Sequence, residues 1–207
     1  MTSLIPSRGV FVSDRRILRK ALRAARAGLT PAERAASSRR IARFIAGTRW
    51  LAPGRRVAIF MSMPEEIDTA PLIELARRRG CELFFPRIDS TRRRRMSFTP
   101  PGPSIVRNRL GIVEFGGAAR KPAAAMQIIF VPLVGFDGRG NRLGMGAGFY
   151  DRALAFRLRR RRWRGPLLIG VAHSCQQTSV IETLPTDVPL DAIVTERGIG
   201  FFRGENA

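Results

Sequence analysis

The sequence predicts an α/β protein: a single three-layer domain with an open, mostly parallel, Rossmann-like sheet and helices on both faces. Five short apolar runs, rich in β-branched residues, alternate with helix-like segments. The first two runs are separated by the length of a βαβ crossover. With 207 residues and 44% hydrophobic content, the chain is long and apolar enough to bury one core. The predicted strands cover residues 56–61, 81–86, 127–131, 167–172 and 191–195.

Local capping signals place the helices between these runs. Ser13 or Asp14 can cap the first helix, and Thr69 can cap the third. Thr30 is followed by a proline and then by Glu33, a pattern that predicts a capping box at the start of the second helix. The predicted helices cover residues 14–28, 31–46, 71–79 and 149–161.

The remaining stretches mark the limits of the domain. Residues 89–123 are rich in proline, glycine and arginine, so we expect irregular structure there, with a short β-ribbon at Met96–Thr99. The domain is expected to span residues 14–198, between a flexible extension at 1–13 and a tail at 199–207. No internal repeat or long linker indicates a second domain.

The charge is unusual. Basic residues number 37 and acidic residues 16, which gives a net charge of +21. Such a charge is compatible with nucleic acid or with a polyanionic small molecule such as ATP as a partner, but a solvated arginine-rich surface is the interpretation that we favour. The densest arginine runs are at residues 92–95 and 157–164.

Other features narrow the class of protein. No apolar run reaches the length of a membrane span, and the first twelve residues lack the pattern of a signal peptide. Two distant cysteines, Cys81 and Cys175, are typical of a reduced, cytoplasmic protein, and with a single histidine they do not make a zinc site. That histidine, His173, is expected to be structural, and Trp50 and Trp163 are expected to pack in the interior rather than stack on bases. Glu65 is expected to be solvated.

The stretch Arg142-Leu-Gly-Met-Gly-Ala-Gly-Phe-Tyr-Asp151 follows the third predicted strand. Its alternating glycines let the backbone approach a ligand closely, and the helix after them can offer free N–H groups to an anion. Arg142 adds a cation, and Asp151 can hold a metal that shares the phosphates. The spacing matches neither the Walker A nor the dinucleotide fingerprint, so the glycines alone fit a structural turn and an anion cradle equally well.

Several polar residues follow predicted strands at the same edge of the sheet. Glu66 comes after the first strand, the glycine stretch after the third and Asp187 after the fourth. In open α/β sheets, ligands bind at the carboxyl ends of the strands. We therefore expect these residues to converge on one site.

At these residues the chain resembles the 5-formyltetrahydrofolate cyclo-ligase family, whose members are also called 5,10-methenyltetrahydrofolate synthetases. The matching motifs occur in the family's order and span residues 14–198. They are the basic pair before Leu22-Arg23, the turn Glu66-Ile-Asp-Thr69, Phe85-Pro86, Met96-Ser-Phe98, Gly111-Ile-Val-Glu114, Val131-Pro132, Phe136-Asp137, the string from Arg142 to Asp151, a glutamine at 176 or 177, Leu184-Pro185 with Asp187, and Ile193-Val-Thr-Glu196.

The resemblance implies a fold of the NagB/RpiA/CoA-transferase-like type and an enzyme of folate and one-carbon metabolism. It implies that 5-formyltetrahydrofolate is converted to 5,10-methenyltetrahydrofolate with MgATP, giving ADP and phosphate. In this reaction the formyl oxygen attacks the γ-phosphate, and N10 then closes the ring as phosphate leaves. We expect a cytoplasmic monomer with ATP as substrate and Mg²⁺ as cofactor, acting on folate with or without a polyglutamate tail.

The resemblance also implies the roles of individual residues. Arg142 and Tyr150 are our choice for stabilising charge on the transferring phosphate, and Glu66 can accept hydrogen bonds from pterin N–H groups. The ATP-binding residues would be Arg19, Lys20, Ala21, Leu22, Arg23, Arg142, Leu143, Gly144, Met145, Gly146, Ala147, Gly148, Phe149 and Tyr150. The folate-binding residues would be Arg23, Met61, Glu66, Met145, Gly146, Ala147, Gly148 and Phe149, and the metal ligands Asp151 and Asp187.

The chain departs from the family pattern at a few positions. Arg19 stands where the family has a lysine, and the lysine is one residue on, at Lys20. Only Thr186 separates Pro185 from Asp187, so Asp191 is an alternative metal ligand. Two other functions stay open at this point: a basic nucleic-acid-binding module, and a homologue that binds folate or nucleotide without turnover.

Overall fold

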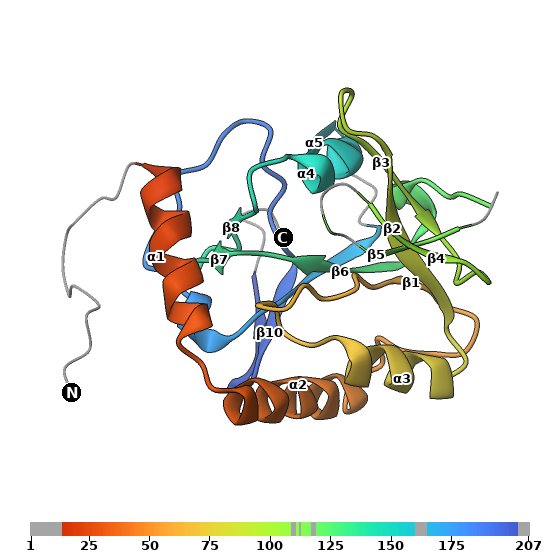
Figure 1. Cartoon of the computed structure of the whole chain (residues 1–207), viewed down its shortest axis with the longest axis horizontal. Helices are drawn as coiled ribbons and strands as arrows, with labels where there is room; N and C mark the ends of the chain where they lie inside the picture. The colour runs from red at the N-terminus through yellow and green to blue at the C-terminus, as the bar shows by residue number, and fades with distance from the viewer. Residues whose placement is uncertain (1–13, 109–110, 112, 117–118, 160–164, 203–207) are drawn as a thin grey trace.

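The structure is a computed structural model that describes residues 14–108, 111, 113–116, 119–159 and 165–202. Within these residues, seven strands form the main sheet in the order β11-β10-β9-β6-β1-β2-β3 (Figure 1). The five inner strands are parallel, and the two edge strands are antiparallel to their neighbours. The strands are β1 Arg56–Ala58, β2 Glu82–Ser90, β3 Arg95–Thr99, β6 Ile128–Pro132, β9 Leu167–Val171, β10 Ala192–Thr195 and β11 Gly198–Phe201. All five predicted strands are therefore confirmed in position.

The helices lie on both faces of this sheet, as predicted (Figure 1). The structure has α1 Arg15–Ala27, α2 Pro31–Ala46, α3 Ala70–Arg78, α4 Phe149–Leu154 and α5 Phe156–Arg159, with 3₁₀ turns η1 Ala123–Ala125 and η2 Ser174–Gln176. Helices α2 and α3 cover one face, and α4 and α5 lie on the other. Helix α1 packs against η2, which follows β9, so it stands at the carboxyl end of the parallel strands. No helix of the described ranges is both long and apolar enough to cross a membrane.

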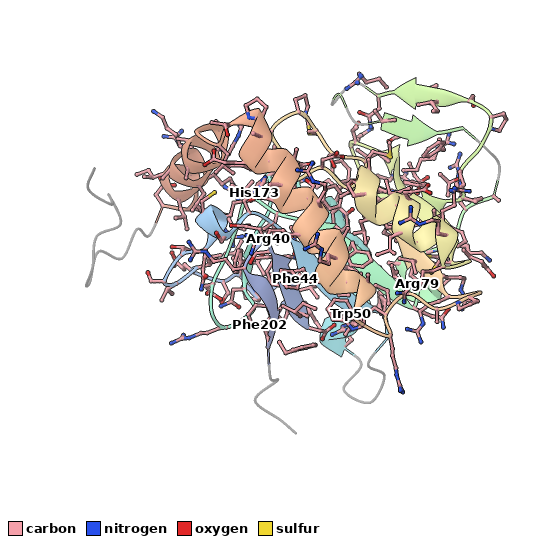
Figure 2. The ribbon with its side chains drawn as sticks, turned by 90° about the horizontal axis from the view of Figure 1, so that it is seen from below. Arg40, Phe44, Trp50, Arg79, His173 and Phe202 are labelled. Carbon is pink, nitrogen blue, oxygen red and sulfur yellow. The ribbon has the colours of Figure 1, made fainter. Side chains whose placement is uncertain are left out.

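Each face of the sheet buries its own core. On the α2 and α3 face, Ile41 and Ile45 of α2 pack with Val57 and Phe130 from the strands. Phe44 and Trp50 lie at the border of this core, where Trp50 also meets Phe201 edge-to-face with ring centroids 6.0 Å apart (Figure 2). The packing role predicted for Trp50 is confirmed, whereas Trp163 lies outside the described residues. The other core contains Ile129, Leu154 and Leu168.

Two of the predicted caps are confirmed, and one is wrong. Asp14 caps α1 by accepting from the Arg16 N–H at 2.7 Å, and Thr30 forms the predicted reciprocal capping box with Glu33. Thr69 does not cap α3 with its side chain. Its buried hydroxyl donates to the Phe60 carbonyl at 2.7 Å, because the chain leaving β1 passes directly beside it.

The predicted helix at 149–161 is also wrong in its extent. The chain forms a six-residue α4 and then, after Ala155, a separate short α5; residues 160–164 lie outside the described ranges. Leu154 at the end of α4 is fully buried in the second core, which fixes α4 against the sheet.

Two predictions about the remaining stretches need correction. The tail predicted at 199–207 begins too early, because residues 199–201 belong to β11, which pairs with β10 and covers its otherwise open edge. The stretch 89–123 is less irregular than predicted. There β2 runs on to Ser90 and pairs with β3, which confirms the ribbon at Met96–Thr99, and β4 Ile105–Arg107 pairs with β5 Val113–Phe115. The predicted flexible extension at 1–13 lies outside the described residues.

Candidate active site

The turn that follows β1 positions Glu66. Ser62 fixes this turn, because its hydroxyl donates to the Ile67 carbonyl and accepts from the Thr69 N–H. Glu66 folds back and accepts from the Met63 N–H at 3.0 Å. Burial raises the pKa of Glu66, while the Met63 N–H and the charge of Arg26 oppose that rise. Glu66 is thus an inward-facing carboxyl group at the carboxyl edge of the sheet.

The glycine loop begins from a small hairpin, in which β7 Gly135–Phe136 pairs with β8 Arg142–Leu143. Gly146 and Gly148 have φ of 103° and 72°, values that residues with a side chain rarely adopt. The Gly144 carbonyl accepts from Arg19 Nε at 2.8 Å, so α1 holds the start of the loop. The loop is therefore a fixed, glycine-dependent structure rather than a free turn.

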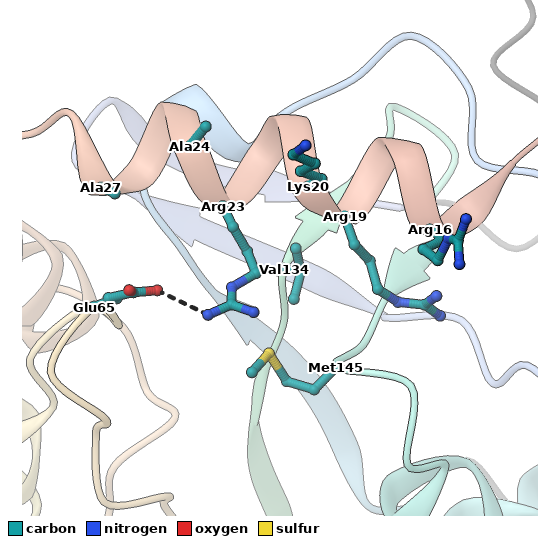
Figure 3. A pocket seen from close by; sticks show the side chains of 9 residues that line it. All are labelled: Arg16, Arg19, Lys20, Arg23, Ala24, Ala27, Glu65, Val134 and Met145. Atoms are coloured by element: carbon teal, nitrogen blue, oxygen red, sulfur yellow. Dashed lines mark hydrogen bonds and ion pairs between the residues drawn. The ribbon is translucent and has the colours of Figure 1, made fainter.

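A cleft of about 440 Å³ separates α1 from the glycine loop (Figure 3). Arg19, Lys20 and Arg23, three predicted ATP-contacting residues, line it together with Met145 from the loop. Figure 3 shows Arg23 reaching across the cleft to Glu65, with 3.4 Å between Arg23 Nη2 and Glu65 Oε2. The other lining residues are Arg16, Ala24, Ala27 and Val134.

Not every predicted binding residue faces this cleft. Leu22 and Leu143 are buried in an apolar cluster with Val134 and Ile181. Gly135 permits this packing, because a Cβ there would lie 2.3 Å from Leu22 Cδ1. The side chains of Leu22 and Leu143 thus fasten α1 to the loop hairpin and contribute to the site through packing.

A narrow crevice lies beside the cleft, at the carboxyl ends of β1, β6 and β9. Glu66 lines it, with Arg26 and Gln176 as the other polar residues. Its apolar walls are Phe60, Ile67, Pro132, Leu133 and Val171. Met61, a predicted folate contact, lines neither the cleft nor the crevice.

The Arg142 side chain and the Tyr150 hydroxyl are buried polar groups on either side of the glycine loop. The Arg142 side chain is 3% exposed, and its Nη2 donates to Asp151 Oδ1 at 2.5 Å. The Tyr150 hydroxyl has no hydrogen-bond partner among the residues that the structure describes. Burial raises the pKa of Tyr150, and the nearby charge of Glu66 raises it further, so the hydroxyl stays protonated and can donate.

The two predicted metal ligands lie in neighbouring segments, and each carries an arginine partner. Asp151 Oδ1 also accepts from the Val188 N–H at 3.3 Å, which brings the chain at Asp187 beside Asp151. Asp187 pairs with Arg15 at 2.6 Å. No group of three or more metal-ligating side chains occurs in the described part of the chain. Mg²⁺ commonly takes one or two carboxylates together with substrate phosphates and water, so a pair of acids is enough for that mode.

The alternative metal ligand, Asp191, is excluded by its position. It precedes β10 and therefore lies at the amino edge of the sheet, opposite the glycine loop. There it pairs with Arg157 at 2.7 Å and accepts from the Leu168 N–H.

Sequence reasoning missed Arg26 and underestimated Glu65. Arg26 is a buried arginine, and its Nη2 lies 3.5 Å from Glu65 Oε2. Glu65 is 44% exposed, yet it lines the cleft and pairs with both Arg23 and Arg26. The available signal was the spacing of Arg19, Arg23 and Arg26, which places all three on one face of α1.

His173 is buried, as expected of a structural residue. Its ring nitrogens make no hydrogen bond within the described ranges, and burial lowers the pKa of the ring. The neighbouring Ser174 hydroxyl is bonded to Glu196 and is not oriented by the histidine. This segment therefore does not supply a nucleophile and base pair.

Comparison with known proteins decides the family. The model of the 5-formyltetrahydrofolate cyclo-ligase family matches residues 12–196. The chain belongs to this cyclo-ligase family. The 5-formyltetrahydrofolate cyclo-ligase of Escherichia coli K12 is 38% identical over 148 residues, which are 67% of this chain and 76% of the relative. The Haemophilus influenzae cyclo-ligase is 31% identical over 185 residues, which are 85% of this chain and 94% of the relative.

Solved structures agree with the cyclo-ligase assignment. The 5,10-methenyltetrahydrofolate synthetase of Aquifex aeolicus has a TM-score of 0.73 and 26% identity, over 93% of this chain and 95% of that one. The synthetase of Mycoplasma pneumoniae has a TM-score of 0.70 over 88% of this chain and 99% of that one; at 22% identity it supports the fold alone. As a cyclo-ligase, the chain is an enzyme of folate metabolism whose family reaction uses ATP.

Proposed function

We propose that this cyclo-ligase converts 5-formyltetrahydrofolate to 5,10-methenyltetrahydrofolate, with release of ADP and phosphate, in the cleft and crevice around the glycine loop. One observation carries the proposal. The loop touches the cations of α1 on one side, through Arg19, and continues into the half-buried Tyr150, whose buried hydroxyl is close enough to Glu66 for that carboxylate to raise the pKa of Tyr150 beyond the effect of burial. One backbone segment can therefore contact an anionic nucleotide and a folate at once.

The nucleotide would occupy the cleft between α1 and the loop. Arg19, Lys20 and Arg23 supply positive charge along that wall, which suits a triphosphate. Arg19 stands where the family has lysine, and its Nε is used on Gly144 while the rest of its guanidinium stays available. The departure at this position thus keeps a cation at the loop.

The folate would place its pterin ring towards Glu66. A carboxylate can accept the two N–H groups that a pterin presents side by side. Met145 and Arg23 line the cleft and would contact the rest of the folate. Residues Met145 to Phe149 are proposed to contact both ATP and folate, which explains how the formyl group could meet the γ-phosphate.

Chemistry of this kind depends on positioning and charge neutralisation. The formyl oxygen forms a bond to the γ-phosphorus as the bond to the ADP oxygen breaks. N10 then attacks the activated carbon and loses its proton to solvent, and phosphate leaves with the electrons of the carbon–oxygen bond. Arg142, held by Asp151, and the Tyr150 O–H would donate to the transferring phosphate. Asp151 and Asp187 would hold Mg²⁺, which neutralises phosphate charge.

The assay that tests the proposal mixes purified protein with 5-formyltetrahydrofolate and MgATP and follows the methenyl product by its ultraviolet absorbance. We expect product in proportion to ATP consumed. Correctly folded protein that binds folate or ATP without forming product would instead be a non-catalytic homologue.

We further infer that the enzyme acts in the cytoplasm as a monomer and accepts polyglutamylated folate. The reduced state expected of two distant cysteines supports the cytoplasm, and the basic cleft supports binding of a polyglutamate tail. Sedimentation of the purified protein, and comparison of KM for mono- and polyglutamylated substrate, test the last two.

A further inference from the structure

Arg26 is a buried cation that the folded chain leaves poorly paired. Its side chain is 3% exposed, and its Nε has no partner among the described residues. Its guanidinium meets the Glu65 carboxylate at 3.5 Å, a long contact with a half-exposed group. Burying a charge with so little compensation costs free energy, and a ligand that completes the pairing would recover it.

The crevice that holds Arg26 adjoins the cleft, and its walls lie too close together to hold a water molecule. Three segments contribute neighbouring residues to both hollows. On α1, Arg23 lines the cleft and Arg26, one turn on, lines the crevice. The same holds for Glu65 and Glu66 after β1, and for Val134 and Leu133 after β6. A ligand that enters along α1 therefore meets Arg26 and Glu66 together once the crevice walls move apart to admit its pterin edge.

We propose that Arg26 is a second pterin-binding residue, whose guanidinium donates to the 4-oxo oxygen of the substrate beside Glu66. This inference rests on the proposed function. A pterin edge presents the 2-amino and N3–H donors next to the 4-oxo acceptor. Glu66 matches the donors, and an arginine in the same crevice matches the acceptor.

Glu65 is the resting partner of this arginine. Its Oε2 joins Arg23, on the cleft side, to Arg26, on the crevice side. Because Glu65 competes with the substrate for Arg26, variants at the two positions act in opposite directions. Loss of Arg26 weakens folate binding, and neutralising Glu65 strengthens it.

The test measures binding of 5-formyltetrahydrofolate to the full chain by titration calorimetry without ATP. Arg26→Met should weaken binding about 10- to 100-fold, the effect of a lost hydrogen bond to a charged group. Arg26→Lys should be intermediate, and Glu65→Gln should bind more tightly than wild type. The matched control is Arg40→Met, which removes the same charge from the exposed surface of α2.

A substrate analogue tests the atom that Arg26 contacts. The 4-amino-4-deoxy analogue of 5-formyltetrahydrofolate replaces the acceptor by a donor, so wild type should bind it about 10- to 100-fold more weakly. Arg26→Met should not distinguish the two ligands. If Arg26→Met does not fold, the affinities of wild type and Glu65→Gln for 5-formyltetrahydrofolate and for its 4-amino analogue still test the proposed contact.

The inference is overturned if folded Arg26→Met binds 5-formyltetrahydrofolate as wild type does, if Glu65→Gln binds it more weakly, or if wild type binds both ligands equally. A wild-type protein that converts 5-formyltetrahydrofolate but fails these comparisons defeats the role of Arg26 alone. A wild-type protein that neither binds nor converts it defeats the proposed function as well.

Discussion

Arg142 carries a charge into the protein interior and meets the carboxylate of Asp151 there. The pair fixes the guanidinium before any ligand arrives, which is the condition for stabilising a transferring phosphate. We expect Arg142→Ala to lower kcat by about 10²–10³-fold, the cost of removing a prepositioned donor. Arg142→Lys keeps the charge but loses the fork geometry, so kcat should also fall while the fold is retained. Steady-state kinetics with circular dichroism as the folding check would decide, and near-normal kinetics in both variants would remove Arg142 from the mechanism.

Glu66 makes the pH dependence of folate binding predictable. Burial raises its pKa above the ordinary glutamate value, and only the ionised form can accept both pterin N–H groups. The KM for 5-formyltetrahydrofolate should therefore rise as the pH falls through this raised pKa, at a higher pH than for an ordinary glutamate. Glu66→Gln should raise KM and flatten that limb, whereas the exposed Glu182→Gln should keep the wild-type profile.

The same pKa shift has a consequence for stability. Because the folded state holds the Glu66 proton more tightly than the unfolded state, this group lowers stability as the pH rises from the unfolded pKa through the folded one. Denaturant unfolding at pH 7 should therefore find Glu66→Gln at least as stable as wild type. A variant that is both inactive and unstable would indicate a structural role for Glu66.

At the scale of elements, the glycine loop depends on backbone conformations that most residues avoid. Gly148 precedes α4 with φ of 72°, and a Cβ there would have space, with Arg94 Nη1 3.9 Å away. Gly148→Ala should thus cost about 1–2 kcal/mol through backbone strain alone. Gly144→Ala is the matched comparison, because its φ lies outside the left-handed region and its Cβ would meet only Arg142 Nη1, at 3.7 Å. Denaturant unfolding of both variants checks this, and equal losses would show that steric contact matters more than φ.

The elements also show what the sequence can and cannot predict. Local patterns predict the five inner strands, through β-branched runs, and the capping box of Thr30 and Glu33, through the spacing of these two residues. Both predictions are confirmed. The prediction of a side-chain cap at Thr69 is wrong because the Thr69 hydroxyl donates its hydrogen bond to a tertiary partner, the Phe60 carbonyl. Strand β11 has little intrinsic strand propensity, with Gly198 and Gly200 in it, and forms through its pairing with β10.

The residues of the site also divide into those that sequence motifs reveal and those that only the folded structure reveals. The glycine stretch, Glu66 and the arginines of α1 could be found from the family's motifs, and the fold brings them to one edge of the sheet. Helical spacing places Arg26 on the face of α1 that carries Arg19 and Arg23, but its importance and that of Glu65 come from burial and from pairing across segments that are about 40 residues apart. Burial of one charge among many arginines is a property of the folded chain and leaves no local pattern.

At the scale of the whole molecule, the arginines behind the net charge of +21 lie both in the cleft and on the outer surface. Exposed arginines such as Arg40 lie on α2, on the face seen from below in Figure 2, whereas Arg16 lines the cleft. Charges attract a nucleotide most when they lie within a Debye length of it, about 8 Å at physiological salt. The cleft arginines should therefore dominate nucleotide capture, and the outer ones should add little.

This argument predicts how salt acts on the enzyme. The KM for ATP should rise several-fold between about 50 and 300 mM salt, because ions screen the attraction. Arg16→Ser should raise KM at low salt and reduce the salt dependence, since it removes a cation from the cleft wall. A triple variant, Arg39→Ser, Arg40→Ser and Arg43→Ser, removes three charges from the exposed side of α2, where Arg16→Ser removes one from the cleft. It should leave the KM for ATP and its salt dependence nearly unchanged.

The triple variant also separates the enzyme from a nucleic-acid-binding module. If the outer arginines served nucleic acid, the wild-type protein would bind RNA tightly, with a steep loss on adding salt, and the triple variant would lose that binding. For a cyclo-ligase whose charge serves the cleft, RNA binding should be weak in both proteins at physiological salt, while ATP turnover stays sensitive to Arg16. If RNA binds tightly and this binding depends on the arginines of α2, while the KM for ATP does not change with salt, then the positive charge serves nucleic acid rather than the nucleotide cleft.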